Sequence, residues 1–465
     1  MTKRHGFADR AAAAVGSTAA KATATGAKRL DERRREAADD FAAMETSRDE
    51  ARRIRLHTLA NLDRYLDDFA QAVADAGGRV HWARDADEAN EIVVAIAREA
   101  AATRAVKSKS MATEEIELNH ALAAAEIEVV ETDLGEFIIQ LAHERPSHII
   151  APVMHKTRQD IGELFEESLG TEYTDDPELL NASARAHLRR IFLEADIGIS
   201  GVNFGVAESG SICLVTNEGN GRLTTTAPRV HVAVMGMERL VPSFRDLGVM
   251  LDVLARSATG QKLTSYTTVI TGPRRHDDPD GPEELHVVVL DNGRSGVLGD
   301  STAEVLACIR CGACLNVCPV YRESGGHAYG TTYPGPIGAV LSPSLLGVGE
   351  WGDLAYGSSL CGACLEVCPV RIDLPRMLVE LRARYVTDGH ADRSLERAIR
   401  RYAAAATRPA VFRALLRAGA LAGKVPRSQE GWIRSLPFMG AAWTDHRDFP
   451  KPDSRPFHRR WKDRA

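Results

Sequence analysis

The spacing of apolar and polar positions divides the chain into segments of different character. Residues 1–65 are rich in alanine, arginine and acidic residues at helical spacing, which predicts a helical N-terminal arm. Over residues 66–295, short runs of β-branched residues alternate with helical stretches, and this alternation favours an α/β domain with a largely parallel sheet. The expected elements are a helix at Glu91–Ala101 and strands at Ile127–Glu131, His148–Pro152, Ser211–Thr216, His231–Met235, Tyr266–Thr271 and His286–Leu290.

The last third of the chain has a different pattern. Residues 296–385 hold seven of the eight cysteines, in two groups that a Gly- and Pro-rich connection separates. Residues 386–465 begin with helical spacing and then become rich in proline and arginine, which predicts a helical, basic C-terminal extension. This extension contains 17 Lys/Arg against 8 Asp/Glu. The excess suits docking on an acidic partner surface, although a solvated helical face has the same composition.

Composition narrows the class of protein. The chain has 465 residues, of which 44% are hydrophobic and 26% charged, and its net charge is −6. That balance is typical of a soluble protein, with no bulk attraction to nucleic acid or to an anionic membrane. We find no apolar run long enough to span a bilayer and no secretory signal, so we expect a cytoplasmic protein whose thiols stay reduced. Eight cysteines in that setting indicate metal or redox chemistry.

The first cysteine group has the spacing that holds cubic iron–sulfur clusters. It reads Cys-x2-Cys-x2-Cys-x3-Cys-Pro, from Cys308 through Cys311, Cys314 and Cys318 to Pro319. Three thiolates at this spacing reach three irons of one cube from a tight loop, whereas the fourth lies too far along the chain and ligates the other cluster. The proline ends the loop and turns the chain away.

The second cysteine group repeats this pattern with one cysteine fewer. The sequence Cys-Gly-Ala-Cys-Leu-x-Val-Cys-Pro-Val occurs at 311–320 and again at 361–370, which is typical of a duplicated ferredoxin unit. Crossing the ligands as two-cluster ferredoxins do predicts two 4Fe–4S clusters in an α-helical ferredoxin domain. The first cluster takes Cys308, Cys311, Cys314 and Cys368, and the second takes Cys318, Cys361 and Cys364.

The position that would complete the second ligand set is occupied by Ser358. Three interpretations are open: Ser358 or the adjacent Ser359 binds the fourth iron through Oγ, water or a partner's ligand holds that iron, or the cluster is 3Fe–4S. We favour a 4Fe–4S cluster with a weaker fourth ligand. An oxygen ligand, or none, shifts the reduction potential and makes one iron labile, because the ligand tunes the cluster.

Structural zinc is the rival interpretation, since zinc sites also use Cys-x2-Cys pairs. Zinc does not require three cysteines at this spacing or the Cys-Pro ending, so the pattern favours iron–sulfur clusters. The eighth cysteine, Cys213, lies in an apolar strand pattern, and we expect it to be a small buried hydrophobic residue and not a nucleophile.

Polar segments of the α/β region are candidates for ligand binding. Glu208 lies next to a Gly- and Ser-rich turn and is either a site carboxylate or an acceptor for turn amides. The stretch Thr216–Arg222 follows a predicted strand, where α/β sheets bind ligands, and suits an anion unless it is a hairpin. Lys107 and Lys109 precede a predicted helix start, which also suits an anion, although solvated lysines are more common.

Other motifs give less support to a binding site. Three histidines, His143, His148 and His155, flank a predicted strand. No carboxylate spacing accompanies them, so hydrogen-bonded or exposed histidines are a better interpretation than metal ligands. The chain has neither a G-x-G-x-x-G nor a Walker A motif, so nucleotide binding has no support. No catalytic residue is identified.

Several ordered motifs resemble the bacterial lactate-utilisation iron–sulfur protein B family, whose members belong to a three-protein complex that oxidises L-lactate. The resemblance covers roughly residues 50–440. It is carried by Val106–Met111, Glu131–Glu136, Ala207–Thr226, Met235–Arg239, Gly260–Tyr266, Gly326–Gly330, Tyr333–Gly338 and both cysteine groups.

This resemblance implies a lactate-utilisation α/β domain of the sugar-isomerase/CoA-transferase type, a two-cluster ferredoxin domain and a family-specific C-terminal extension. It implies the same seven cysteine ligands and a second cluster with three cysteines. The expected function is electron transfer in the oxidation of L-lactate to pyruvate, with the other subunits of the complex as partners and an unidentified electron acceptor. The alternative is a self-sufficient hydroxy-acid oxidoreductase that uses the open corner of the second cluster. A DNA-binding cluster sensor ranks last, because no DNA-reading helix pair is evident.

Overall fold

The computed structural model describes residues 6–422, 428–429, 431–437, 440–445, 447–453, 455 and 457–463. The first five residues of the predicted N-terminal arm and parts of the predicted C-terminal extension lie outside the described residues. The chain divides into two compact units between Tyr385 and Val386. Within the described ranges, no helix is both long and apolar enough to cross a membrane.

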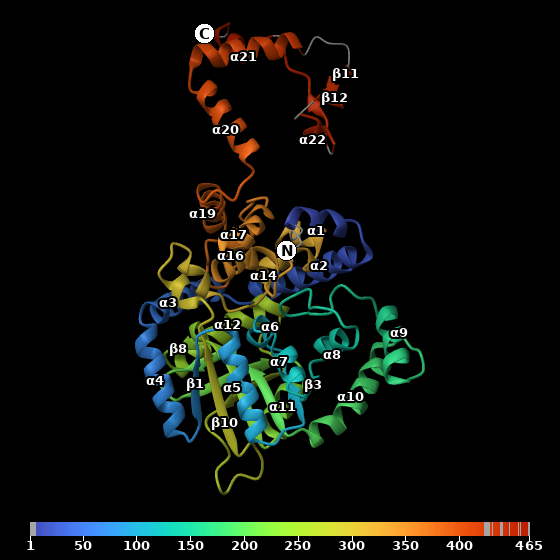
Figure 1. The fold of residues 1–465 in the computed structure, drawn as a ribbon, viewed down its shortest axis with the longest axis vertical. Coiled ribbons are helices and arrows are strands. Elements are labelled where there is room, and N and C mark those ends of the chain that lie inside the picture. Colours follow the sequence, from blue (N-terminus) through green and yellow to red (C-terminus); the bar gives the residue numbers. More distant parts are fainter. Residues whose placement is uncertain are drawn as a thin grey trace. The chain divides into compact units, whose positions relative to one another are not determined.

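A six-stranded sheet forms the centre of the first unit (Figure 1). Every neighbouring pair of its strands runs parallel, so the predicted α/β class with a largely parallel sheet is confirmed. The predicted strands at Ile127–Glu131, His231–Met235 and His286–Leu290 belong to it. In spatial order the strands are β1 (Arg79–Ala83), β10 (Glu284–Leu290), β7 (Val230–Gly236), β4 (Ile197–Gly201), β2 (Arg104–Lys107) and β3 (Glu128–Glu131).

A second, mixed sheet of four strands contains the other two predicted strands that the structure forms. The order is β8 (Leu240–Val241), β5 (Phe204–Val206), β6 (Ser211–Thr216) and β9 (Tyr266–Ile270). The strand predicted at His148–Pro152 is wrong, because this stretch is a closed loop. The Ser147 amide donates to the Pro152 carbonyl, and the amides of Ile150 and Ala151 donate to Nδ1 of His148.

The central sheet is covered on both faces. Alternate residues of β7 and β10 point to opposite sides, as strand geometry requires. On one side Val232 and Val234 pack with α5 (Ala86–Glu99) and α7 (Leu118–Ala124). On the other side Ala233 and Met235 pack with α4 (Leu62–Asp75) and the second sheet. Further helices of this region are α6 (Met111–Glu115), α8 (Leu134–Leu141), α9 (Arg158–Leu169), α10 (Pro177–Glu194), α11 (Asn220–Thr226), η1 (Met237–Arg239) and α12 (Phe244–Thr259).

The N-terminal helices join the α/β region to the cysteine-rich segment. They are α1 (Phe7–Ala14), α2 (Thr18–Asp39) and α3 (Met44–Ala60). Helix α2 contacts both α12 and α14 (Ala313–Val317), and Figure 1 shows α1 and α2 beside α14. The side chain of Arg55 on α3 is 1% exposed and donates to carbonyls of both regions, namely Glu238, Leu240, Leu306 and Ala307.

The cysteine-rich segment is helical and belongs to the first unit, as the predicted ferredoxin-type class requires. Besides α14 its elements are α13 (Arg294–Leu298), η2 (Ala303–Ala307), α15 (Pro319–Ser324), η3 (His327–Tyr329), α16 (Gly335–Leu346), α17 (Val348–Trp351), η4 (Gly352–Tyr356), α18 (Ala363–Glu366) and α19 (Leu374–Thr387). The second unit contains α20 (Arg393–Ala406), α21 (Pro409–Ala422), β11 (Ser428–Gln429), β12 (Trp432–Ile433), α22 (Ala441–Thr444), β13 (Phe449–Pro450) and α23 (Phe457–Lys462).

Candidate iron–sulfur centre

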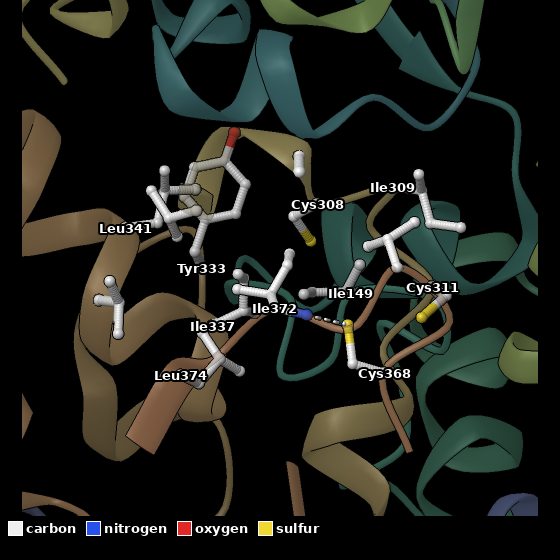
Figure 2. Close-up of a cluster of buried hydrophobic side chains, with 14 of the residues drawn as sticks. Ile149, Cys308, Ile309, Cys311, Tyr333, Ile337, Leu341, Cys368, Ile372 and Leu374 are labelled. Atoms are coloured by element: carbon white, nitrogen blue, oxygen red, sulfur yellow. Dashed lines mark hydrogen bonds between the residues drawn. The ribbon is translucent and has the colours of Figure 1, made fainter. Parts of the chain in front are cut away.

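The four cysteines assigned to the first cluster line one small cavity. Cys308 precedes the tight loop, Cys311 and Cys314 lie in it, and Cys368 arrives from the second cysteine group, 50 residues after Cys318. Figure 2 shows the sulfur atoms of Cys308, Cys311 and Cys368 around the same space, with Ile149 beside them. The rest of the lining is mainly aliphatic: Ile149, Ile309, Ile337, Val370, Ile372 and Leu374.

Two main-chain amides donate to sulfur at this first site. The Arg310 amide lies 3.3 Å from Sγ of Cys308, and the Ile372 amide lies 3.4 Å from Sγ of Cys368 (Figure 2). Such bonds stabilise thiolate over thiol and tune the reduction potential of a bound cluster. Without iron, burial raises the pKa of Cys368 to about 11. Iron binding at this site therefore releases protons.

The three cysteines assigned to the second cluster lie nearer the surface. Cys318 is buried, Cys364 is half-buried and Cys361 is exposed. Burial, together with the neighbouring thiols of Cys318 and Cys361, raises the pKa of Cys364 to about 12. The same three side chains that the crossed pattern groups together thus lie within electrostatic reach of one another.

The two cysteine repeats have the same local backbone. Gly312 and Gly362 both have positive φ, of 75° and 85°. Two positions earlier, Arg310 and Leu360 have φ of 60° and 54°, values that side-chain-bearing residues seldom adopt. The Leu360 amide donates to Oγ of Ser358 at 3.1 Å, as the Arg310 amide donates to Sγ of Cys308. Ser358 therefore occupies the same place in its repeat as Cys308 does in the first.

The donor set fits cubic clusters. Seven cysteines fall in two groups, and the site of the first cluster has an aliphatic lining and amide donors aimed at sulfur. Within the described ranges, no three His, Cys, Asp or Glu side chains converge as ligands of a single metal ion do. A cube distributes its thiolates over different irons, so its ligands do not need to converge in that way.

Arginines hold the loops of both cysteine groups in place. Arg48 on α3 donates to the carbonyls of Glu366 and Cys368, and Nη1 of Arg239 donates to the Cys308 carbonyl at 3.1 Å. Arg382 on α19 donates to the carbonyls of Ala355 and Ser358, both at 2.9 Å. These bonds fix ligand-bearing backbone through carbonyl groups and leave the sulfur atoms free for iron.

A larger cavity, of about 560 Å³, lies in the α/β region. Residues that follow parallel strands line it, at the edge where open α/β sheets bind ligands. Ser108 follows β2, Asp133 follows β3 and Val202 follows β4. Arg310 and Ile149 line this cavity and also the cavity of the first cysteine site. The two cavities therefore share a wall.

Comparison with known protein families agrees with this arrangement. Residues 66–290 match the LUD domain, 304–372 match a 4Fe–4S dicluster domain, and 383–465 match the C-terminal domain of lactate utilisation protein B. Lactate utilisation protein B of Macrococcus caseolyticus is 49% identical over 92% of this chain and 91% of its own. The chain belongs to the lactate utilisation protein B family.

Other members of this family have similar identity. The Bacillus subtilis lactate utilisation protein B is 46% identical over 98% of this chain and 96% of its own length. An uncharacterised electron transport protein, YkgF of Escherichia coli, is 46% identical over 95% of this chain and 92% of its own. The family membership and the two predicted 4Fe–4S clusters are thereby confirmed, and the dicluster match decides against structural zinc.

The polar candidates in the α/β region separate into two sets. Lys109 and part of the predicted anion loop, including Glu218 and Asn220, line the larger cavity. That loop continues into α11 and is not a hairpin. Arg222 is exposed and does not line the cavity. Glu208 accepts a hydrogen bond of 2.7 Å from the Phe244 amide at the start of α12, so it is an acceptor for a main-chain amide.

Lys107, His148 and His155 have structural partners, whereas His143 is exposed. Lys107 is fully buried and not solvated, with Nζ 2.7 Å from Glu131. Nε2 of His148 lies 3.0 Å from Oδ1 of Asn316, and burial lowers the pKa of His148 to about 3. His148 is therefore neutral and joins the α/β loop to α14. Cys213 is buried in β6, as expected for a small hydrophobic residue.

Sequence reasoning missed several charged residues that line the larger cavity, among them Glu238, Arg239, Arg294 and Arg310. Three of them belong to motifs that were identified, but no local pattern distinguishes a charged cavity residue from a surface one. The one usable signal was the difference between repeats, since Arg310 corresponds to Leu360.

Proposed function

We propose that this protein is the iron–sulfur electron-transfer subunit of a complex that oxidises L-lactate to pyruvate, which allows lactate to serve as a carbon source. The observation that carries the proposal is the union of a dicluster segment and a LUD domain in one compact unit. Relatives that span the same length are named for lactate utilisation, and one is named for electron transport.

The proposed ligands follow the crossed pattern. Cys308, Cys311, Cys314 and Cys368 would hold the first cluster, and Cys318, Cys361 and Cys364 the second. Ser358 would approach the remaining iron of the second cluster, because its Oγ corresponds to Sγ of Cys308. When bound, each 4Fe–4S cluster supplies a site that accepts and returns one electron.

The chain's own residues would give the two sites different tasks. The first site shares a wall with the α/β cavity and is closed by aliphatic side chains, which exclude water. The second site has an exposed cysteine, and Tyr356 and Leu360 beside it are 48% and 37% exposed. Oxidation of lactate to pyruvate releases two electrons and two protons. We infer that electrons enter from the side of the first site and leave to a partner at the second.

The self-sufficient oxidoreductase has less support. That alternative places a hydroxy acid on the open corner of the second cluster. No described residue of the second cysteine group lines the larger cavity, which adjoins the first site instead. A carrier that depends on partner subunits agrees better with this geometry.

Anaerobic purification tests the proposal directly. We expect about eight irons and eight sulfides per chain and a brown chromophore that dithionite bleaches. About seven irons, with a 3Fe–4S EPR signal after mild oxidation, would indicate that Ser358 does not hold the fourth iron. Zinc without sulfide would contradict electron transfer by this chain. In a host that grows on L-lactate, deletion of the gene is expected to abolish that growth, and normal growth would contradict the metabolic assignment.

A further inference from the structure

The larger cavity contains a charged side chain with one nitrogen that lacks a hydrogen-bond partner. Nη1 of Arg310 is buried and makes no hydrogen bond, and the side chain is only 9% exposed. Its guanidinium lies over the ring of Tyr333 and beside Glu238, and both of these residues line the cavity. A buried donor without an acceptor is costly, because it loses water and gains nothing in return.

The neighbouring carboxylates do not neutralise this part of the cavity. Glu238 lies 2.7 Å from Nε of Arg294 and 3.3 Å from Nη2 of Arg310, so two arginines share it. Glu115 is engaged by both terminal nitrogens of Arg294. Arg239 adds a further buried guanidinium on the same wall. Around Arg310, two carboxylates thus lie beside three arginines, whereas Lys109, Asp133 and Glu218 form a separate charged group in the lining. An anion would balance the local excess of positive charge at Arg310.

A second unpaired group lies elsewhere in the same cavity. Oδ1 of Asn220 is buried and accepts no hydrogen bond, and the residue is 7% exposed. An amide oxygen needs a donor such as a hydroxyl group. The remaining lining includes aliphatic residues such as Ile138, Val153 and Leu254. The cavity therefore offers a cationic wall, an acceptor and an apolar surface, which is the composition of a small-molecule site.

We propose that this cavity binds a hydroxylated organic acid, with its carboxylate on Arg310 and a hydroxyl directed to Asn220. The inference rests on the proposed function and extends it, because it assigns a ligand class to the α/β cavity. Arg310 lies between Cys308 and Cys311 in the chain, and its main-chain amide donates a hydrogen bond to Sγ of Cys308. A bound carboxylate adds negative charge beside the first cluster and lowers its reduction potential, whereas the second cluster is unaffected.

Exchanging the residues at one corresponding position of the two repeats provides a matched pair of variants. Leu360 corresponds to Arg310 and has nearly the same φ, so Arg310→Leu places a residue that this backbone already accepts. Leu360→Arg adds an arginine at the corresponding position of the second repeat, away from the cavity. Arg310→Lys restores the charge with one nitrogen in place of the guanidinium.

The experiment is an EPR-monitored redox titration of the anaerobic holoprotein with and without 20 mM L-lactate, together with calorimetric titration of the oxidised protein. Pyruvate, which lacks the hydroxyl donor, and acetate are the comparison probes. We expect lactate to bind more tightly than either and to lower the potential of one cluster only. Arg310→Leu should weaken binding about tenfold or more and remove the shift, Arg310→Lys should restore part of both, and Leu360→Arg should retain both.

The outcomes separate this inference from the proposed function. Intact clusters that titrate identically with and without lactate, together with no calorimetric signal, would overturn the ligand assignment and leave electron transfer standing. A shift that persists in Arg310→Leu would also overturn it, because the anion would then bind elsewhere. Absence of iron and sulfide would instead contradict the proposed function.

Discussion

The two cysteine repeats have one backbone and two environments. Residues 308–320 and 358–370 share the Cys-Gly-Ala-Cys motif and the positive φ values. In both, a main-chain amide donates a hydrogen bond to the side chain at the first ligand position. The first repeat is enclosed between the α/β region and the N-terminal helices, so Cys308 and Cys311 are 9% and 7% exposed. The second carries the exposed Cys361. The two repeats thus have the same loop backbone, whereas tertiary packing determines how exposed each cysteine site is.

The difference in exposure between the two cysteine sites implies a direction for electron flow between the two clusters. An enclosed site resists solvent and couples to the adjoining cavity, and an open site is accessible to a partner surface. Ser358 in place of a cysteine strengthens the contrast, because a hydroxyl ligand binds iron more weakly than a thiolate. We expect the two clusters to differ in stability and potential even though their loops match.

The largest effect is expected from the removal of one cysteine of the enclosed first site. Cys368→Ala should remove the first cluster, lowering iron by about four per chain, and should also lower the thermal midpoint, because Cys368 lies in the main core cluster. Cys361→Ala should lower iron by a similar amount with a much smaller change in midpoint. Iron analysis and thermal unfolding followed by circular dichroism check both variants. Equal destabilisation by the two substitutions would contradict the distinction between an enclosed first site and an open second site.

Arg55 is expected to have the next largest effect. Its guanidinium donates to carbonyls of both the α/β region and the segment before Cys308, and its removal leaves buried carbonyls without donors. Arg55→Met should cost about 3 kcal/mol or more of unfolding free energy and should make the first cluster dissociate sooner. Denaturant unfolding and the decay of visible absorbance measure these effects. Arg53→Met on the same helix is the control, since Arg53 is exposed and pairs only with Glu50 in the described contacts.

A third change would make the repeats more alike. Ser358→Cys should supply a thiolate to the second cluster and slow the loss of its fourth iron under mild oxidation, by about tenfold or more if that corner is the labile one. Ser359→Cys is the matched control, because Ser359 lies one residue out of register with Cys308. The 3Fe–4S EPR signal measures the outcome. Equal protection by both variants would contradict the correspondence between Ser358 and Cys308.

These features differ in how far the sequence could predict them. Local spacing predicted seven cysteine ligands and Ser358 at the missing position, because cluster loops are short and their geometry depends on consecutive residues. The parallel sheet was predicted from alternation, but β1, β2 and β4 were not located, since charged residues, histidine or glycine interrupt their apolar runs. His148–Pro152 has the composition of a strand and forms a loop, because its histidine ring accepts amides that a strand partner would otherwise bind.

The cavity could not be predicted in the same way. Its lining comes from the ends of separate strands and from Arg310 of another domain. Bringing these together is a tertiary effect that no local pattern records. Lys107 shows the same limit, since an exposed-looking lysine in sequence is buried against Glu131 in the fold.

The last expected effect is a pH dependence of folding stability that arises from Glu218 in the larger cavity. Burial raises the pKa of Glu218 to about 7, and the neighbouring Asp133 adds to the rise. Between pH 4.5 and 7 the unfolded chain has released this proton and the folded chain retains it, so stability falls as pH rises through that window. Below pH 4.5 both states are protonated, and the contribution is complete.

Glu218→Gln removes this titration. Relative to wild type, the variant should gain up to about 3 kcal/mol of unfolding free energy on going from pH 4.5 to pH 7.5, with the change spread over pH 4.5 to 7 and levelling off above pH 7. Denaturant midpoints across this range measure the difference, with Glu208→Gln, which lies outside the cavity, as the control. A pH-independent difference between Glu218→Gln and wild type would mean that Glu218 is ionised throughout. The cavity would then carry one more negative charge, and its preference for an anion would be weaker than the excess of guanidinium groups around Arg310 implies.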